Sequence, residues 1–247
     1  MSYTTDFYEG QAGGSLQAAR VVVPILTRLF EPSSVIDVGC GVGTWMRVFE
    51  EAGVQRCAGI EGAWIRSQRT LVDRELITVA DLNAPLHVKE RYDLAITLEV
   101  AEHLRPESSE RFVGLLTSLS DTVVFSAAIP GQGGTDHVNE RWPDFWRNHF
   151  SARGYQCTDL LRPLLWHKDM PYWYAQNAFV YHRGPLSAEV RRKWEQLLGG
   201  EPAFPLRAVH PEKVKRIGTG EDLSVRQLAK LMPPLLLRSL KRRLHLP

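Results

Sequence analysis

The segment at residues 35–45, VIDVGCGVGTW, constrains the fold of this chain more than any other part of the sequence. A short apolar run carries one acid, Asp37, and leads into glycines at positions 39, 41 and 43. Glycine tolerates positive φ and lets the backbone approach a ligand closely. Residues 44–52 then read as a helix that stops at Gly53. The segment therefore predicts a strand, a tight turn and a helix in succession.

The same alternation continues along the chain. After a polar arm (1–13) and an apolar helix (16–30) with a kink at Pro24, buried strands are expected at 35–38, 57–60, 77–80, 92–98, 122–128, 155–160 and 173–181. A helix that starts near Pro106 would share one apolar face among Phe112, Leu115, Leu116 and Leu119. Strands alternating with helices predict an α/β fold, a Rossmann-like, doubly wound open sheet of seven strands.

The glycine spacing and nearby acids indicate the ligand. The pattern is G-x-G-x-G, with Asp37 two residues before the first glycine, whereas the dinucleotide fingerprint is G-x-G-x-x-G. An acid there would repel a pyrophosphate and attract the positively charged methionine end of S-adenosylmethionine. Glu61 and Asp81 end the next two predicted strands, where ligands of open α/β sheets bind. Glu61 suits the ribose hydroxyls, and Asp81, with Leu82 beside the ring, suits adenine.

The motifs VIDVGCGVGTW, GIEG, ADL and YDLAITLEVAEHL, in this order, resemble those of the class I S-adenosylmethionine-dependent methyltransferases, over about residues 30–181. The resemblance implies a seven-stranded sheet whose last strand is antiparallel. It implies that Asp37, Gly39 and Gly41 contact the methionine part of the cofactor and that Glu99 lies beside it. The later stretches SAAIPGQGGTDHVNERWPDFWRNHF and WYAQN resemble a bacterial subgroup associated with sugar and secondary-metabolite biosynthesis.

The charge distribution divides the chain. Residues 184–247 carry 13 Lys and Arg against 6 Asp and Glu, whereas the rest is acidic. We therefore expect a methyltransferase domain over 1–183 and a basic, helical C-terminal extension over 184–247. An acidic body is poorly suited to nucleic acid. The leucine- and arginine-rich end, 235–244, could dock on an anionic membrane, on an acidic protein or on a second copy in a homodimer.

The expected reaction is methyl transfer to a small molecule, most simply to a hydroxyl of a sugar or secondary metabolite. An alcohol needs a base near neutral pKa, and His137 in the loop GQGGTDHVN is the first candidate, oriented by Asp136 or Asn139. His103 is the second, with a pKa that Glu99 and Glu102 would raise. We expect no metal, since no histidine and cysteine spacing matches a zinc site.

Alternatives remain open on the sequence alone. They are N-methylation of a small molecule, methylation of protein or RNA, and a non-catalytic binding protein of the same fold. Aromatic residues of the arm and of the segment 162–173 could line an acceptor site, where Arg162 and Lys168 could hold a carboxylate or phosphate. Three widely spaced cysteines and no signal-like or membrane-spanning stretch lead us to expect a cytoplasmic protein.

Overall fold

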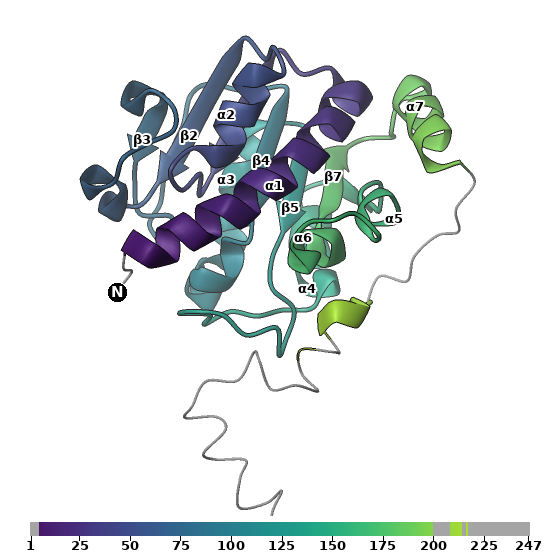
Figure 1. Ribbon diagram of the computed structural model, residues 1–247. Coiled ribbons are helices and arrows are strands. Elements are labelled where there is room, and N and C mark those ends of the chain that lie inside the picture. The colour runs from purple at the N-terminus through teal and green to yellow at the C-terminus, as the bar shows by residue number, and fades with distance from the viewer. Residues whose placement is uncertain (1–4, 200–207, 214–215, 217–247) are drawn as a thin grey trace, which may run out of the picture.

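The computed structural model describes residues 5–199, 208–213 and 216 (Figure 1). Seven strands form one sheet in the order β3-β2-β1-β4-β5-β7-β6. The strands are β1 (Ser34–Val38), β2 (Arg56–Glu61), β3 (Ile77–Val79), β4 (Leu94–Leu98), β5 (Thr122–Ser126), β6 (Tyr155–Thr158) and β7 (Phe179–Arg183). The first five are parallel, and β7 runs antiparallel to both β5 and β6. The expected α/β sheet with an antiparallel last strand is confirmed.

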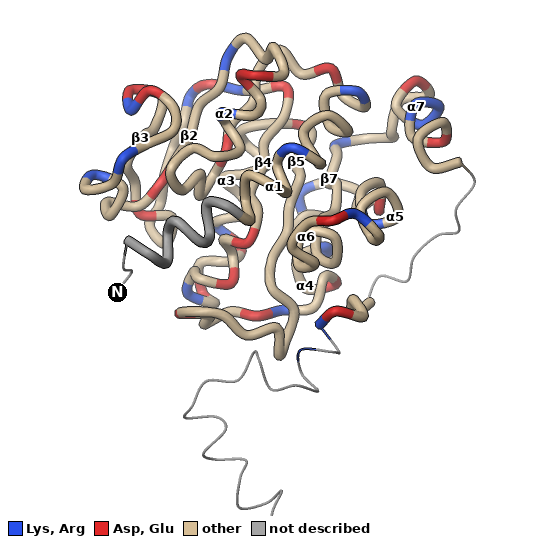
Figure 2. Tube along the Cα trace, viewed as in Figure 1, with Lys and Arg blue, Asp and Glu red and all other residues tan. Residues whose placement is uncertain are grey.

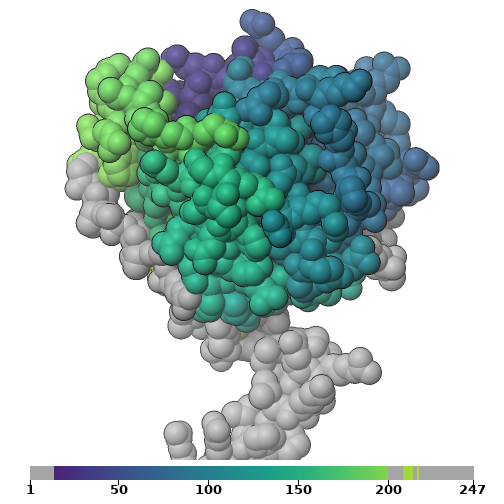
Figure 3. Space-filling view, turned by 180° about the vertical axis from the view of Figure 1, so that it is seen from behind, coloured from purple at the N-terminus to yellow at the C-terminus, as the bar shows by residue number. Residues whose placement is uncertain are grey.

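Helices cover both faces of the sheet. They are α1 (Thr5–Phe30), α2 (Thr44–Glu51), α3 (Ser109–Leu119), α4 (Pro143–Ser151), α5 (Arg162–Leu165), α6 (Tyr172–Asn177) and α7 (Ala188–Leu198), with short 3₁₀ turns η1 (Ala63–Ser67), η2 (Arg74–Leu76), η3 (Ala101–His103) and η4 (Pro106–Ser108). One apolar core lies under α1 and α2, on the near side in Figure 1. A second apolar core lies under α3 and α4. The middle of the chain, coloured teal, covers much of the face of the molecule that Figure 3 shows from behind. The four expected apolar residues of α3 are all buried in the second core.

Two expectations about secondary structure are wrong. Residues 173–177 were expected to begin the last strand, but they lie in α6, and the strand begins only at Phe179. Their continuous apolar and aromatic run suits a buried helix as well as a buried strand. The first helix also begins at Thr5, within the stretch expected to be a loose arm, and continues through Pro24 to Phe30.

The start of the C-terminal extension packs on the domain. Ser187 caps α7 by accepting a hydrogen bond from the Val190 amide, and Gly199 ends the helix in a left-handed conformation. Lys193 pairs with Glu31 at 2.8 Å, and Figures 1 and 3 show α7 beside α1. The rest of the expected helical extension, including the basic end at 235–244, lies outside the described residues.

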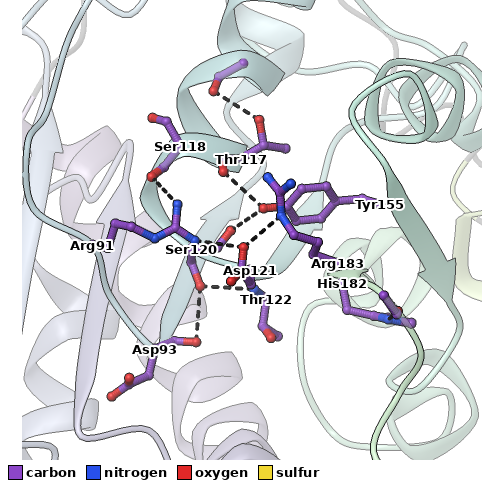
Figure 4. A network of polar contacts seen from close by, with 12 residues as sticks. Arg91, Asp93, Thr117, Ser118, Ser120, Asp121, Thr122, Tyr155, His182 and Arg183 are labelled. Atoms are coloured by element: carbon purple, nitrogen blue, oxygen red, sulfur yellow. Dashed lines mark hydrogen bonds and ion pairs between the residues drawn. The ribbon is translucent and has the colours of Figure 1, made fainter.

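A polar network ties the inserted strand β7 to its surroundings, away from the glycine turn (Figure 4). Asp121 accepts hydrogen bonds from Arg91 at 2.8 Å and from Arg183 at 2.9 Å. The Tyr155 hydroxyl donates to the carbonyls of Thr117 and Ser120. These contacts join β6 and β7 to the end of α3.

Both charges occur throughout the described chain. Figure 2 shows Lys and Arg interspersed with Asp and Glu along the chain. Among the described residues, no helix has the combination of length and apolar character needed to cross a bilayer.

Candidate functional site

The expected site residues gather at one edge of the sheet. The parallel strands β1, β2 and β4 end at Val38, Glu61 and Leu98, and the register pairs Val38 with Ile60. The glycine turn, Glu61 and Glu99 therefore follow neighbouring strands at their carboxyl ends. Open α/β sheets bind ligands at this edge.

The three glycines of the turn have different reasons to be glycine. All have positive φ, at 83° for Gly39, 56° for Gly41 and 87° for Gly43. A Cβ on Gly39 would lie 2.4 Å from Val100, and one on Gly43 would lie 2.6 Å from Val72. A Cβ on Gly41 would meet nothing within 4 Å. Gly39 and Gly43 are thus required by the protein's own packing, and Gly41 borders space that a ligand can use.

Asp37 is buried, with 2% of its surface exposed, and its Oδ2 has no hydrogen-bond partner in the part of the chain that the structure describes. Burial raises the pKa of Asp37 well above its ordinary value, and the negative charge of Glu61 raises it further. A buried carboxyl without a partner is costly unless a charge or donor satisfies it. A cationic ligand at the strand ends would do so.

Glu61 holds the glycine turn together, a role that its sequence position did not reveal. Its Oε2 accepts a hydrogen bond from the Gly41 amide at 2.7 Å. Its Oε1 accepts from the Gly62 amide at 2.6 Å and from the Trp64 indole at 3.0 Å. Burial raises the pKa of Glu61, and these three hydrogen bonds oppose that shift. Oε1 already accepts two hydrogen bonds, but Oε2 accepts only one and keeps a lone pair that can accept from a ligand hydroxyl.

Asp81 and Leu82 follow β3 at the same edge. Asp81 is exposed, and its Oδ1 accepts from the Asn83 amide at 2.9 Å. Leu82 is buried in the second core, with 8% of its surface exposed. Asp81 is therefore free to meet a ligand, and Leu82 is fixed by packing.

Glu99 is surrounded by side-chain amides from two distant segments. It has a positive φ of 58°, and its carboxylate accepts from Gln132 at 2.8 Å and from Asn177 at 3.1 Å. Burial raises the pKa of Glu99, against the lowering effect of these amides. Asn177 lies on α6, the helix mistaken for a strand, so the sequence could not predict this arrangement.

The C-terminal extension reaches this amide cluster. The Gln176 side chain accepts from the His210 amide at 2.8 Å. Lys213 is buried, and its Nζ donates to the Gln132 carbonyl. His210 and Lys213 thus help to fix the segments that carry the side chains around Glu99.

The two candidate histidines lie together, with ring centroids 4.8 Å apart. His137 Nδ1 lies 3.0 Å from Glu140, whose carboxylate also accepts from the amides of Gly131 and Gly133. Burial works against ionisation of Glu140, but these hydrogen bonds outweigh it and lower its pKa. Glu140, not Asp136 or Asn139, therefore orients His137.

The expected direction of the shift in the His103 pKa is wrong. Burial, and then the charge of His137, lowers the pKa of His103 to about 4, whereas nearby glutamates were expected to raise it. Desolvation of the ring outweighs the acids because the side chain is largely enclosed. The proposed anion-binding role of Arg162 is also unsupported, since Arg162 is buried, pairs with Asp159 at 2.6 Å and lies over the Phe179 ring.

A family model described as a methyltransferase domain matches residues 11–158. The chain belongs to this methyltransferase family. The match spans the glycine turn, Glu61, Asp81, Glu99 and the histidine pair. No curated protein sequence matches the chain significantly.

Solved methyltransferases share the fold. The methyltransferase domain of bacterial CtHen1 matches with a TM-score of 0.52 and 19% identity, covering 69% of this chain and 98% of that one. CalS10 of Micromonospora echinaspora, an amino pentose methyltransferase of calicheamicin biosynthesis solved with S-adenosylmethionine, matches with a TM-score of 0.52 and 13% identity, covering 74% and 98%. Magnesium protoporphyrin IX methyltransferase from Synechocystis, solved with SAH, matches with a TM-score of 0.50 and 19% identity. The match covers 74% of this chain and 90% of that one.

S-adenosylmethionine is the cofactor that the family and the fold imply, and the residues at the strand ends fit it. The unpartnered Asp37 oxygen suits its positive charge. Open space at Gly41 leaves room for it.

Proposed function

We propose that this methyltransferase transfers the methyl group of S-adenosylmethionine to a hydroxyl of a small molecule, a sugar or a secondary metabolite. The observation that carries the proposal is the His137–Glu140 pair beside Glu99, in the loop that follows β5. CalS10, a methyltransferase of an amino pentose, shares the fold and supports a sugar-like acceptor.

The chain's own residues would hold the cofactor in three parts. Asp37 and the backbone at Gly39 and Gly41 would meet the methionine part, with Glu99 beside it. Glu61 would accept from the ribose hydroxyls, and Asp81 would accept from the adenine amino group while Leu82 packs on the ring. The cofactor supplies the reactive methyl group. The protein supplies alignment of the acceptor with that group, which is a large source of rate.

His137 would take the acceptor's proton. A useful general base has a pKa near the working pH, and the low pKa of His103, about 4, makes His103 a poor base at neutral pH. In His137, one ring nitrogen faces Glu140 at 3.0 Å, so the other is left for the acceptor. The ionised Glu140 would stabilise the imidazolium that forms.

The variant His137→Gln tests this role. Glutamine preserves much of the shape and hydrogen bonding but cannot accept the proton. We expect the turnover number to fall about 10²–10⁴-fold while cofactor affinity is unchanged. His149→Gln on α4, a histidine away from the loop, is the matched control. Wild-type turnover of His137→Gln with normal binding would refute the base assignment.

The acceptor atom must be identified directly. A screen of sugars and aromatic metabolites with isotopically labelled cofactor, followed by mass-spectrometric location of the added methyl, would do this. Methyl on nitrogen would contradict O-methylation and leave the methyltransferase assignment intact.

We also propose a cytoplasmic location. All three cysteines are free, and Cys40 and Cys57 are buried. Burial raises the pKa of Cys57 to about 12, so its thiol stays protonated. Free thiols are typical of a reducing compartment.

A further inference from the structure

Three metal-ligand side chains meet beside the proposed active site. Glu102 and His103 lie on η3, directly after Glu99, and His137 lies in the loop after β5. One potential ligand atom from each of the three lies within 4.8 Å of the others. From the sequence we expected no metal, because no spacing of histidines and cysteines matches a zinc site.

The backbone holds the two segments in place. The amides of Val138 and Asn139 both donate to the Glu102 carbonyl, at 2.9 and 3.0 Å. The buried Asn139 side chain donates to Ser109 at 3.0 Å and to the Ala101 carbonyl at 3.3 Å. The loop is therefore fixed against η3, and the three side chains are brought together by the fold itself.

The cluster contains buried polar atoms that nothing in the described residues satisfies. Glu102 is fully buried, and its carboxylate oxygens make no hydrogen bond of good geometry among the described residues, although the Glu99 carboxyl and the Ala128 backbone lie close to them. His103 Nδ1 is likewise buried without a partner. Leaving such groups unpaired costs free energy, so buried charged groups are normally paired or coordinate a metal.

We propose that Glu102, His103 and His137 bind one divalent transition-metal cation. Two imidazoles and one carboxylate favour Mn²⁺, Fe²⁺, Co²⁺ or Zn²⁺ over Mg²⁺ and Ca²⁺, which prefer all-oxygen sites. Ligand atoms about 2.1 Å from one ion lie at most about 4.2 Å apart. The observed limit of 4.8 Å requires only a small adjustment of the side chains.

Glu140 completes the arrangement from outside the cluster. Metal-bound histidines usually donate their second ring nitrogen to a carboxylate or carbonyl, which fixes the ring and strengthens the ligand. Glu140 meets His137 in this way through Nδ1 at 3.0 Å, leaving Nε2 for a cation. Two main-chain amides in turn donate hydrogen bonds to Glu140, so the carboxylate that orients His137 is itself held in place.

The site itself does not depend on the proposed function, but its use does. Three protein ligands leave open positions, where an acceptor hydroxyl could bind and become more acidic. The acceptor O–CH₃ bond would form as the S–CH₃ bond breaks, and the hydroxyl proton would leave to solvent. With the cation bound, activation of the hydroxyl by the metal would replace proton removal by His137.

Binding is tested on the full-length protein after chelator treatment and dialysis. Titration with Co²⁺, followed by visible d–d absorption and calorimetry, should show one cation per chain. Glu102→Gln and His103→Gln should each weaken binding at least tenfold, and Glu140→Gln about 10–100-fold. His167→Gln, at an exposed histidine in the segment between β6 and β7, is the control and should bind Co²⁺ as the wild type does.

The absence of stoichiometric binding, or equal binding by the wild type and by folded Glu102→Gln and His103→Gln, would overturn the proposal. Circular dichroism establishes which variants are folded, and Glu140→Gln remains informative if a ligand variant is not. Turnover with and without the cation is measured separately. A protein that binds Co²⁺ at these residues but methylates no hydroxyl would refute the proposed function and not the metal site.

Discussion

Glu61 gives the sharpest test of the cofactor assignment. In Glu61→Ala, S-adenosylmethionine would lose the charge-assisted hydrogen bond that the free Oε2 lone pair can accept from a ribose hydroxyl, worth about 1.5–3 kcal/mol. This energy corresponds to an affinity loss of about 10–10²-fold, because each 1.4 kcal/mol is about tenfold. Calorimetric titration of wild type and variant measures this loss directly. Unchanged affinity would remove the ribose assignment.

The structure adds a second effect that must be separated from the first. The same substitution leaves the amides of Gly41 and Gly62 without their acceptor, at a cost of about 1–3 kcal/mol for each donor that stays buried. A chain of this size should then lose roughly 2–4 °C in Tm per kcal/mol. Trp64→Phe is the matched control, since it removes one donor to Glu61 and keeps the carboxylate. We expect Trp64→Phe to bind the cofactor within severalfold of wild type.

Three further outcomes are expected. Burial raises the pKa of Asp37, so its carboxylate form, which attracts the cationic cofactor, is lost as pH falls. The affinity measured by calorimetry should therefore rise as pH increases above the ordinary aspartate pKa, and Asp37→Asn should largely remove this dependence. Hydrogen bonds from Ser33 and Ser34, at 2.6–3.0 Å, lower the pKa of Asp93. The folding stability that these hydrogen bonds contribute is fully present above the ordinary aspartate pKa, and it is lost as pH falls through the lowered pKa of Asp93. Asp93→Asn should therefore cost about 1 kcal/mol in urea unfolding at pH 7 and nearly nothing near pH 2, and equal stability at pH 7 would contradict this. Removal of residues 233–247 should reduce co-sedimentation with anionic liposomes or change the mass measured by light scattering, and no difference in either assay would exclude a docking role for the basic end.

Local patterns in the sequence predicted the sheet and the edge that carries the site. The run before Gly39 and the acids after successive strands are short-range features, and parallel strands bring their carboxyl ends together whatever the loops do. The prediction of a strand at residues 173–177 failed, because a short aromatic run has no periodicity that distinguishes a buried helix from a buried strand. The prediction for the pKa of His103 failed because that pKa depends on burial of the ring by distant segments. The acids adjacent in the sequence give no information about this burial.

The cluster of Glu102, His103 and His137 was beyond prediction for a related reason. It forms through hydrogen bonds between the Glu102 carbonyl and a loop more than 30 residues later. The amide environment of Glu99 likewise draws on Gln132 and Asn177, and the Lys213 contact comes from beyond the core domain. Pairings of this kind depend on loop paths, for which one sequence offers no periodic signal.

The inverted strand β7 has a consequence for synthesis on the ribosome. β7 lies between β5 and β6, yet it is made after both. When residue 158 has emerged, β6 has no neighbour in the sheet, and β5 exposes an unpaired edge on that side. Unpaired edges are prone to wrong association while a chain is incomplete. The nascent protein therefore depends on prompt arrival of residues 179–183, and slowing translation between β6 and β7 should increase its capture by chaperones.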